Sequence, residues 1–138
     1  MSYSLAHAKH VHAVHEHLCN KTTFFDWQVV TAFYSALHYV THKLFVVPRP
    51  LPHDATRLVS TFSAYASAVN QHIRPAYIPP HDLRKQLVAE HCSDIADAYE
   101  RLFDAANSAR YKNFNVSQMG QQFTAKDYKT VIDFCTST

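Results

Sequence analysis

The sequence predicts an all-α fold, an up-and-down antiparallel bundle of about five helices. Apolar residues recur at intervals of three and four along most of the 138 residues, which is the spacing of one face of an α-helix. The chain also contains a single glycine, Gly120, whereas hairpins and tight β turns usually need residues that accept positive φ. The length fits one domain, residues 1–138, in which helices with single apolar stripes are buried against each other around one core.

The first two helices are expected on either side of Asn20 and Lys21. The first should span about residues 4–20. Its apolar stripe consists of Tyr3, His7, Val11, Val14 and Leu18. The second should begin at Asp26, whose side chain can cap it. Its apolar face consists of Val30, Phe33, Leu37, Val40 and Leu44, flanked by Trp27, Tyr34, Ala36 and Phe45. So wide an apolar face predicts the central helix.

Prolines then interrupt the helical pattern. In the segment VVPRPLPHD each proline removes a backbone donor and disfavours helical geometry in the residue before it. We interpret this segment as a linker between two helical hairpins. A third helix should begin at Asp54 or its neighbour and end before Arg74 and Pro75. Its apolar residues are Leu58, Phe62, Tyr65 and Val69.

The remainder of the chain predicts two more helices. A long fourth helix should begin close to Asp82, where the helix dipole favours negative charge, and reach Arg110 or Tyr111. Its inward-facing residues are Leu83, Leu87, Ile95, Tyr99, Leu102 and Ala106. A last helix is expected over about residues 124–134.

Composition excludes several classes of protein. No segment approaches the roughly 18 to 20 unbroken apolar residues of a membrane span, and the N-terminus lacks the pattern of a secretory signal, so we expect a cytoplasmic protein. The three cysteines form no CxxC pair and are expected to be free thiols. No phosphate-cradling glycine motif can be built from one glycine, so no nucleotide cofactor is expected. A net charge of +2 leaves RNA as a partner without requiring it.

Histidine is unusually frequent, with 11 in the chain and five in the first helix. At about 100° per residue these five do not converge on one ion. The pair His12 and His15, three residues apart, is a weak candidate for metal binding that would need a further ligand from another helix or subunit. The other interpretation is solvent-exposed histidines, whose titration near pH 6.5 would make the domain pH-responsive.

Two segments resemble the HEPN family of helical domains. The segment FFDWQVVTAFYSALHYVTHKLF, residues 24–45, is similar to the second helix of that family, and AYERLFDAANSARYKNF, residues 98–114, resembles its late Tyr-x-x-Leu stretch followed by Ala-Arg-Tyr. The resemblance implies a helical bundle that commonly forms a homodimer. It also implies a family that includes metal-independent RNases and inactive partners of nucleotidyltransferases, in toxin–antitoxin or defence systems.

Active HEPN proteins carry an arginine followed, after four to six residues, by a histidine. There the arginine would stabilise phosphate charge and the histidine would transfer protons. Arg110, the family-like arginine, has no histidine at that distance, which counts against catalysis. The spacing is met by Arg74 with His81 and by Arg84 with His91, and only Arg84 and His91 should share a helix face. The alternative is a salt-bridged Arg84 and a surface His91.

Two other groups are candidates for binding. Arg110, Tyr111 and Lys112 could hold a phosphate and stack on a base, although cations are favoured at a helix end in any case. On the second helix, residues at the edge of the apolar face could line a groove or a dimer interface, with core packing as the other explanation. These residues are Tyr34, His38 and Tyr39.

Three functions follow from these patterns. The first is a non-catalytic HEPN-like interaction domain that forms a homodimer and binds a nucleotidyltransferase-type protein or RNA. The second is a metal-independent endoribonuclease in which Arg84 clamps a phosphate and His91 transfers protons, with this pair facing the same two residues of the other subunit across a dimer. The third is a histidine-rich, metal-binding or pH-responsive bundle, in which zinc would stabilise the fold through His12 and His15.

Overall fold

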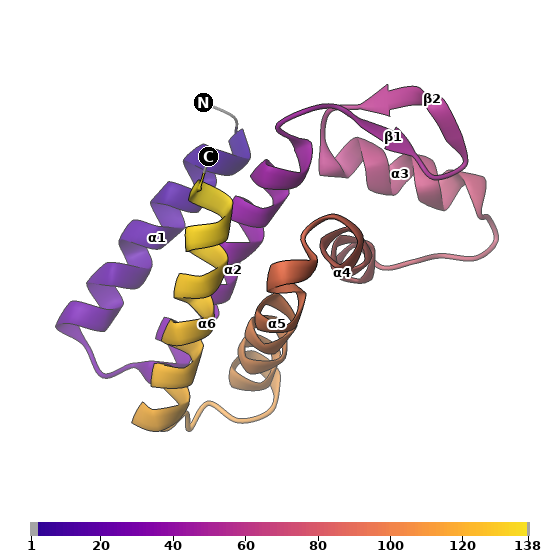
Figure 1. Ribbon diagram of the computed structural model, residues 1–138. Helices are drawn as coiled ribbons and strands as arrows, with labels where there is room; N and C mark the ends of the chain where they lie inside the picture. The colour runs from indigo at the N-terminus through magenta and orange to yellow at the C-terminus, as the bar shows by residue number, and fades with distance from the viewer. Residues whose placement is uncertain (1–2, 138) are drawn as a thin grey trace.

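The computed structural model describes residues 3–137, with side chains from residue 4 onward, and confirms the all-α class. Over these residues the chain forms six α-helices, one short 3-10 turn and one two-stranded sheet (Figure 1). In chain order the elements are α1 (Tyr3–Lys21), α2 (Phe25–Phe45), β1 (Arg49–Leu51), β2 (Asp54–Val59), α3 (Phe62–His72), α4 (Pro80–His91), η1 (Ser93–Ile95), α5 (Ala96–Tyr111) and α6 (Gln118–Thr136). None of the described helices is long and apolar enough to cross a membrane.

Helices α1, α2, α5 and α6 lie side by side and form the bundle (Figure 1). Helix α2 contacts the other three, so it is the central helix, as its wide apolar face predicted. Along α2 the buried side chains occupy more than one helix face, which explains why the apolar pattern is not a single stripe. Asp26 lies in the first turn of α2, but no side chain caps this helix, so the predicted cap is wrong. The carboxylate still lies where the helix dipole favours it.

The buried face of α1 differs by one residue from the predicted stripe. Ala8 and His15 are buried, whereas Val14 of the predicted stripe is 41% exposed. His7, Val11 and Leu18 of the predicted stripe are half-buried, so the buried face is turned only partly, toward Ala8 and His15. The cause is close packing on α2, since small Ala8 lets the Ser35 hydroxyl donate to its carbonyl oxygen at 3.2 Å. The Tyr3 side chain, also assigned to that stripe, lies outside the described part of the structure.

The sheet, α3 and α4 form a second region, which we call the arm, at the end of α2 (Figure 1). The predicted linker and the predicted helix start at Asp54 are wrong, because residues 49–59 form an antiparallel hairpin in which Arg49 pairs with Val59. Proline is compatible with the edge of such a short sheet. Leu51 and Val59 are buried there. Helix α3 begins only after Thr61, whose hydroxyl accepts a hydrogen bond from the Ala64 N–H at 3.1 Å.

The predicted long fourth helix is interrupted at Cys92. There the backbone leaves helical geometry (φ −135°, ψ 46°), and η1 separates α4 from α5. Ser93 and Asp94 follow directly, and such residues disfavour helix interiors because their side chains compete for backbone hydrogen bonds. The inward-facing residues are nevertheless buried as predicted on both sides of the break: Leu83, Leu87, Ile95, Tyr99, Leu102 and Ala106.

Side-chain hydrogen bonds hold the loop between α3 and α4 and the start of the last helix. The Asn70 side chain of α3 holds the loop between α3 and α4, because it donates to the Ile78 carbonyl at 3.0 Å and accepts from the Ile78 N–H at 2.8 Å. The predicted helix over residues 124–134 exists but begins earlier, at Gln118, where Ser117 accepts from the Gly120 N–H at 3.0 Å. The first turns of α6 carry no apolar stripe, so periodicity did not reveal them.

Candidate binding surfaces

Arg110 is the centre of an exposed aromatic cluster at the end of α5. It lies in the last turn of this helix, where the dipole favours a cation. Its Nη1 donates to the hydroxyl of Tyr34 on α2, and the guanidinium lies 5.5 Å from the centre of the Tyr34 ring. The Tyr111 ring centre lies 4.8 Å from the same guanidinium. Tyr34 thus fixes the arginine from one side, while Tyr111 covers it from another.

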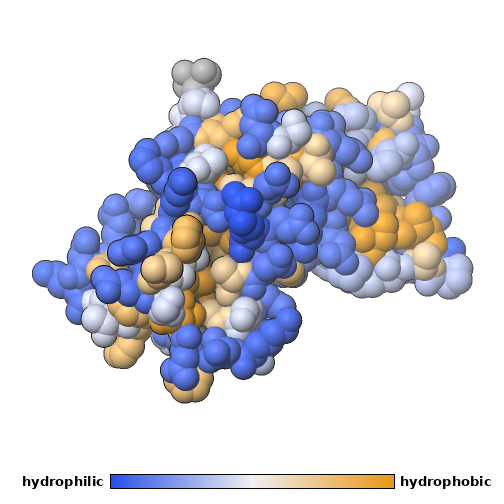
Figure 2. Space-filling model, turned by 60° about the horizontal axis from the view of Figure 1, so that its bottom comes forward, coloured by the Kyte–Doolittle hydropathy of each residue, from blue (hydrophilic) through white to orange (hydrophobic). Residues whose placement is uncertain are grey.

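Further aromatic rings surround this cluster. A cavity of about 310 Å³ joins Arg110 to Trp27 at the start of α2 and to Phe114 in the α5–α6 connection. Trp27, Tyr111 and Phe114 are 55%, 68% and 71% exposed. Figure 2 looks onto the end of the molecule at the bottom of Figure 1, where hydrophobic residues reach the surface between hydrophilic ones. We define the Arg110 surface as Trp27, Tyr34, Arg110, Tyr111 and Phe114.

The Arg110 surface carries positive charge that is not neutralised by an ion pair. Among residues 3–137, no carboxylate lies within 4.0 Å of the charged nitrogens of Arg110 or Lys112. Arg101, about two and a half turns earlier on α5, differs in this respect, because it makes two hydrogen bonds to Asp127 of α6, at 2.9 and 3.0 Å. Asp26 at the start of α2 lines the same cavity as Arg110 but forms no ion pair with it, so the cations at the end of α5 can still bind an anionic group beside one carboxylate.

A groove between α1 and α2 continues from this surface. It measures about 550 Å³ and is lined mainly by apolar groups of Val11, Val14, Trp27 and Val30, with His7, His10, Thr31, Tyr34, His38 and Arg110 as its polar members. The His7 and His38 rings stack at 3.9 Å. Burial, the neighbouring His7 and Arg84 lower the pKa of His38 to about 4, so this imidazole is neutral at physiological pH.

Sequence reasoning found part of these surfaces. Tyr34 and His38 line the groove, as one interpretation expected, whereas Tyr39 is buried in the core, as the other did. Arg110 and Tyr111 were recognised as a cluster from their adjacency in the chain. Trp27 and Phe114 were not recognised as their neighbours, because they belong to segments that only the folded bundle brings together.

The structure does not bring Arg84 and His91 together. Arg84 is only 8% exposed and lies between α4, α2 and α3, where its Nε donates to the Thr41 hydroxyl at 3.1 Å. His91 is exposed at the end of α4 beside Glu90, with 3.6 Å between nitrogen and carboxylate oxygen. The two side chains line different cavities. A shared phosphate clamp and proton-transfer group therefore has no geometric support within one chain.

The two histidines considered for a metal are engaged in hydrogen bonds. His12 Nδ1 lies 2.5 Å from the Tyr128 hydroxyl and Nε2 lies 3.1 Å from the Glu16 carboxylate. His15 is 6% exposed, so its interpretation as a surface residue is wrong, and its Nδ1 lies 3.0 Å from the Thr31 hydroxyl. Burial lowers the pKa of His15 and raises that of the neighbouring Cys19 thiol. Over residues 3–137 no three His, Cys, Asp or Glu side chains are grouped to hold a metal.

No protein-family model, curated protein or solved structure matches this chain. The resemblance to HEPN domains therefore stays a prediction, resting on residues 24–45 and 98–114. These segments contain α2 and most of α5, which pack against each other in the bundle.

Proposed function

We propose that the chain is a non-catalytic, HEPN-like interaction domain that binds single-stranded RNA at the Arg110 surface. The observation that carries this proposal is a guanidinium, without an ion-pair partner among residues 3–137, set among four aromatic rings of which three are more than half exposed. Single-stranded nucleic acids bind where cations neutralise phosphates and exposed rings stack on bases. Lys112 adds a second positive charge beside the same rings.

Binding without catalysis is proposed for two reasons. Arg84 and His91 line separate cavities, and Arg84 is too deeply buried to contact the backbone of an RNA chain. Arg110 is exposed, but no histidine follows it at the spacing of active HEPN proteins. Electrostatic attraction and stacking remain as the means of binding, and stacking contributes about 1–3 kcal/mol per base.

The test is fluorescence anisotropy of a labelled single-stranded RNA of mixed sequence. Arg110→Gln should weaken binding about tenfold or more, because it removes both the charge and the cation–ring contacts. Arg101→Gln is the matched control, since it removes the same charge from the same helix at an ion-paired position. Its affinity should fall only by the smaller, salt-dependent effect of net charge. Equal losses in the two variants, or no RNA binding by the wild type, would contradict the proposal.

An RNase assay in EDTA separates this proposal from catalysis. The proposal predicts that the wild-type protein and His91→Ala both leave RNA intact. Cleavage by the wild type that His91→Ala abolishes, with the fold preserved, would replace the binding domain by an endoribonuclease. Because Arg84 and His91 lie in separate cavities of one chain, such an enzyme would need residues of a second chain to complete its site.

A second candidate function is homodimer formation through the groove between α1 and α2. The observation that favours it is the exposed apolar edge of the groove, where Val14 and Trp27 face solvent. A nucleotidyltransferase-type partner, as the resemblance implies, would use the same groove. Val14→Asp should convert a dimer to a monomer in sedimentation velocity. Ala13→Asp adds the same charge at the exposed neighbour outside the groove and should leave the dimer intact. A wild-type monomer at all concentrations would exclude the homodimer.

A further inference from the structure

A second arginine, Arg84, is buried where the bundle meets the arm. Only 8% of it is exposed, and its guanidinium lies 4.1 Å from the centre of the Phe62 ring at the start of α3. Nε donates to the Thr41 hydroxyl on α2 at 3.1 Å. The side chain therefore bridges α4, on which it lies, to both α2 and α3.

The charge of Arg84 has no counter-ion in the part of the chain that the structure describes. No carboxylate of residues 3–137 lies within 4.0 Å of it. Its polar neighbours are Thr41, which carries no charge, and the buried Tyr99. Burial raises the pKa of Tyr99 to about 12 even beside the arginine, so this side chain is neutral as well. Burial also lowers the pKa of Arg84 itself. Buried charges in proteins are normally paired, so the protein supplies less negative charge than this cation requires.

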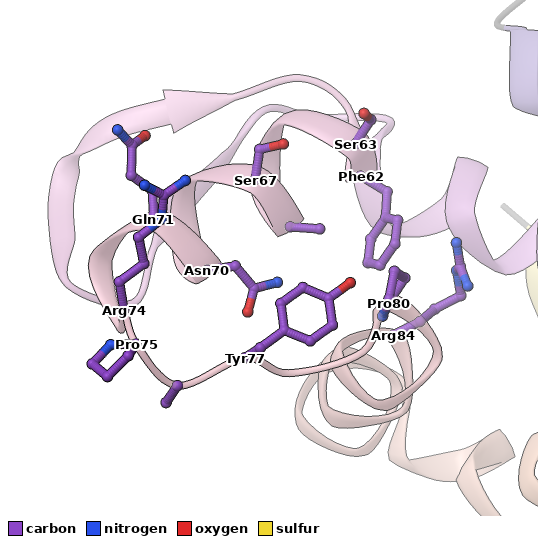
Figure 3. A pocket seen from close by; sticks show the side chains of 12 residues that line it. Phe62, Ser63, Ser67, Asn70, Gln71, Arg74, Pro75, Tyr77, Pro80 and Arg84 are labelled. Atoms are coloured by element: carbon purple, nitrogen blue, oxygen red, sulfur yellow. The ribbon is translucent and has the colours of Figure 1, made fainter.

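Two cavities meet at this arginine. They measure about 890 and 650 Å³ and share Phe62, Ser63 and Arg84 in their linings. Neither lining contains an aspartate or a glutamate. Figure 3 shows the larger cavity, with Phe62 and Arg84 at one end, Arg74 at the other, and the side chains of Asn70 and Tyr77 between them. Both cavities therefore present cations and neutral polar groups, and no acidic group, to a ligand.

The beginning of α3 borders the same junction. Thr61 satisfies two backbone donors of this helix, because its hydroxyl accepts from the Ala64 N–H and its carbonyl oxygen from the Tyr65 N–H. The first two N–H groups of the 11-residue helix belong to Phe62 and Ser63, the residues that line both cavities. Unsatisfied N–H groups at a helix start, together with the helix dipole, attract anions.

We propose that the junction of these two cavities binds a phosphate group, with the Arg84 guanidinium and the start of α3 as its anion-binding groups. A guanidinium fork and backbone N–H groups together match the several acceptor oxygens of phosphate. The cavities are larger than a phosphate needs, and the rings of Phe62 and Tyr77 flank the larger one, so a phosphorylated small molecule would fit as well as the free ion. This site shares no residue with the Arg110 surface, so the two proposals are independent and can be tested separately.

The test is calorimetric titration of the folded chain with inorganic phosphate, at ionic strength held constant with chloride. Arg84→Met removes the charge while keeping an unbranched side chain, and should weaken phosphate binding about tenfold or more, the loss typical of a charge-assisted hydrogen bond. Arg57→Met is the matched control, since it removes the same charge from the exposed face of β2, away from both cavities. Its affinity should equal that of the wild type. Equal affinity of Arg84→Met and wild type would overturn the proposal.

A second measurement covers the case in which Arg84→Met fails to fold. In the ¹⁵N-labelled wild-type chain, phosphate should shift the NMR signals of the Arg84 Nε–H group and of the Ser63 amide, while chloride should not. No shift of either signal at tens of millimolar phosphate would overturn the proposal. Titration with 5′-AMP distinguishes the sources of the phosphate group. An affinity at least tenfold above that of inorganic phosphate identifies a phosphorylated small molecule, whereas equal affinities identify the free ion.

Discussion

The bundle and the arm are stabilised in different ways. In the bundle, α2 is buried by three helices along most of its length, and the contacts are mainly between apolar side chains. The arm shares the same apolar core through buried side chains of the hairpin, α3 and α4, but its elements make fewer contacts with one another and with the bundle. Polar groups add to these contacts, with Asn70 fixing the α3–α4 loop and Arg84 reaching across to α2. A region of lower contact density can open locally at lower cost. The arm is therefore the part of the molecule in which a ligand can alter stability most.

The largest expected effect comes from removing the same side chain in each region. Leu44→Ala in α2 should lower the free energy of unfolding by about 3–5 kcal/mol, because the surrounding helices cannot collapse into the cavity. Leu51→Ala in β1 should cost less, about 2–3 kcal/mol, because a short edge hairpin can relax. Urea denaturation followed by circular dichroism measures both values. A cost for Leu51→Ala equal to that for Leu44→Ala would show that the arm is as rigidly packed as the bundle.

The next comparison concerns the two arginines. Arg84→Ala should cost about 2–4 kcal/mol, since the emptied volume and the lost contacts with Phe62 and Thr41 outweigh the relief of removing an unpaired buried charge. Arg110→Ala should cost less than about 1 kcal/mol, because its contacts are largely solvent-exposed. Thermal unfolding in phosphate-free buffer gives both values. If Arg110→Ala is the more destabilising variant, the Arg110 surface is part of the stabilising core rather than a surface for a partner.

The same difference between regions explains what the sequence could predict. Helices α2 and α5 have long apolar repeats, so their helical structure and inward faces followed from periodicity, although α5 was expected as part of one helix with α4. The hairpin did not, because its strands are only three and six residues long, and the prolines in and beside β1, at positions 48, 50 and 52, are equally typical of a linker. The sequence did not identify Thr61 and Ser117 as capping residues, because a cap can be recognised only when the first residue of its helix is known.

The candidate sites were partly predictable for a related reason. Arg110 and Tyr111 are adjacent in the chain, so the sequence alone indicated their cluster. The burial of Arg84 was not predictable, since charged helix residues are exposed far more often than buried. Likewise, His12 and His15 are three residues apart, yet His15 is buried against α2 whereas His12 forms a hydrogen bond with Tyr128 of α6. Such roles depend on which helices become neighbours, and a single sequence does not contain that information directly.

The smallest expected effect concerns His38, which lines both the α1–α2 groove and the smaller Arg84 cavity, and so lies where the two regions meet. Folding lowers the pKa of its imidazole from 6.5 to about 4, through burial, His7 and Arg84. Between these values the unfolded chain binds a proton that the folded chain does not, so stability falls as the pH drops from about 6.5 to about 4 and is independent of this group above that range.

The full shift would correspond to about 3 kcal/mol, which partial exposure reduces to roughly 1–2 kcal/mol. His38→Gln should therefore flatten the loss of stability between pH 6.5 and 4, measured by urea denaturation at several pH values. His10→Gln, at an exposed position of the same groove, is the matched control and should leave the slope unchanged. If both variants keep the wild-type slope, the acid sensitivity arises from other histidines whose pKa burial lowers, namely His15, His42 and His81, rather than from His38.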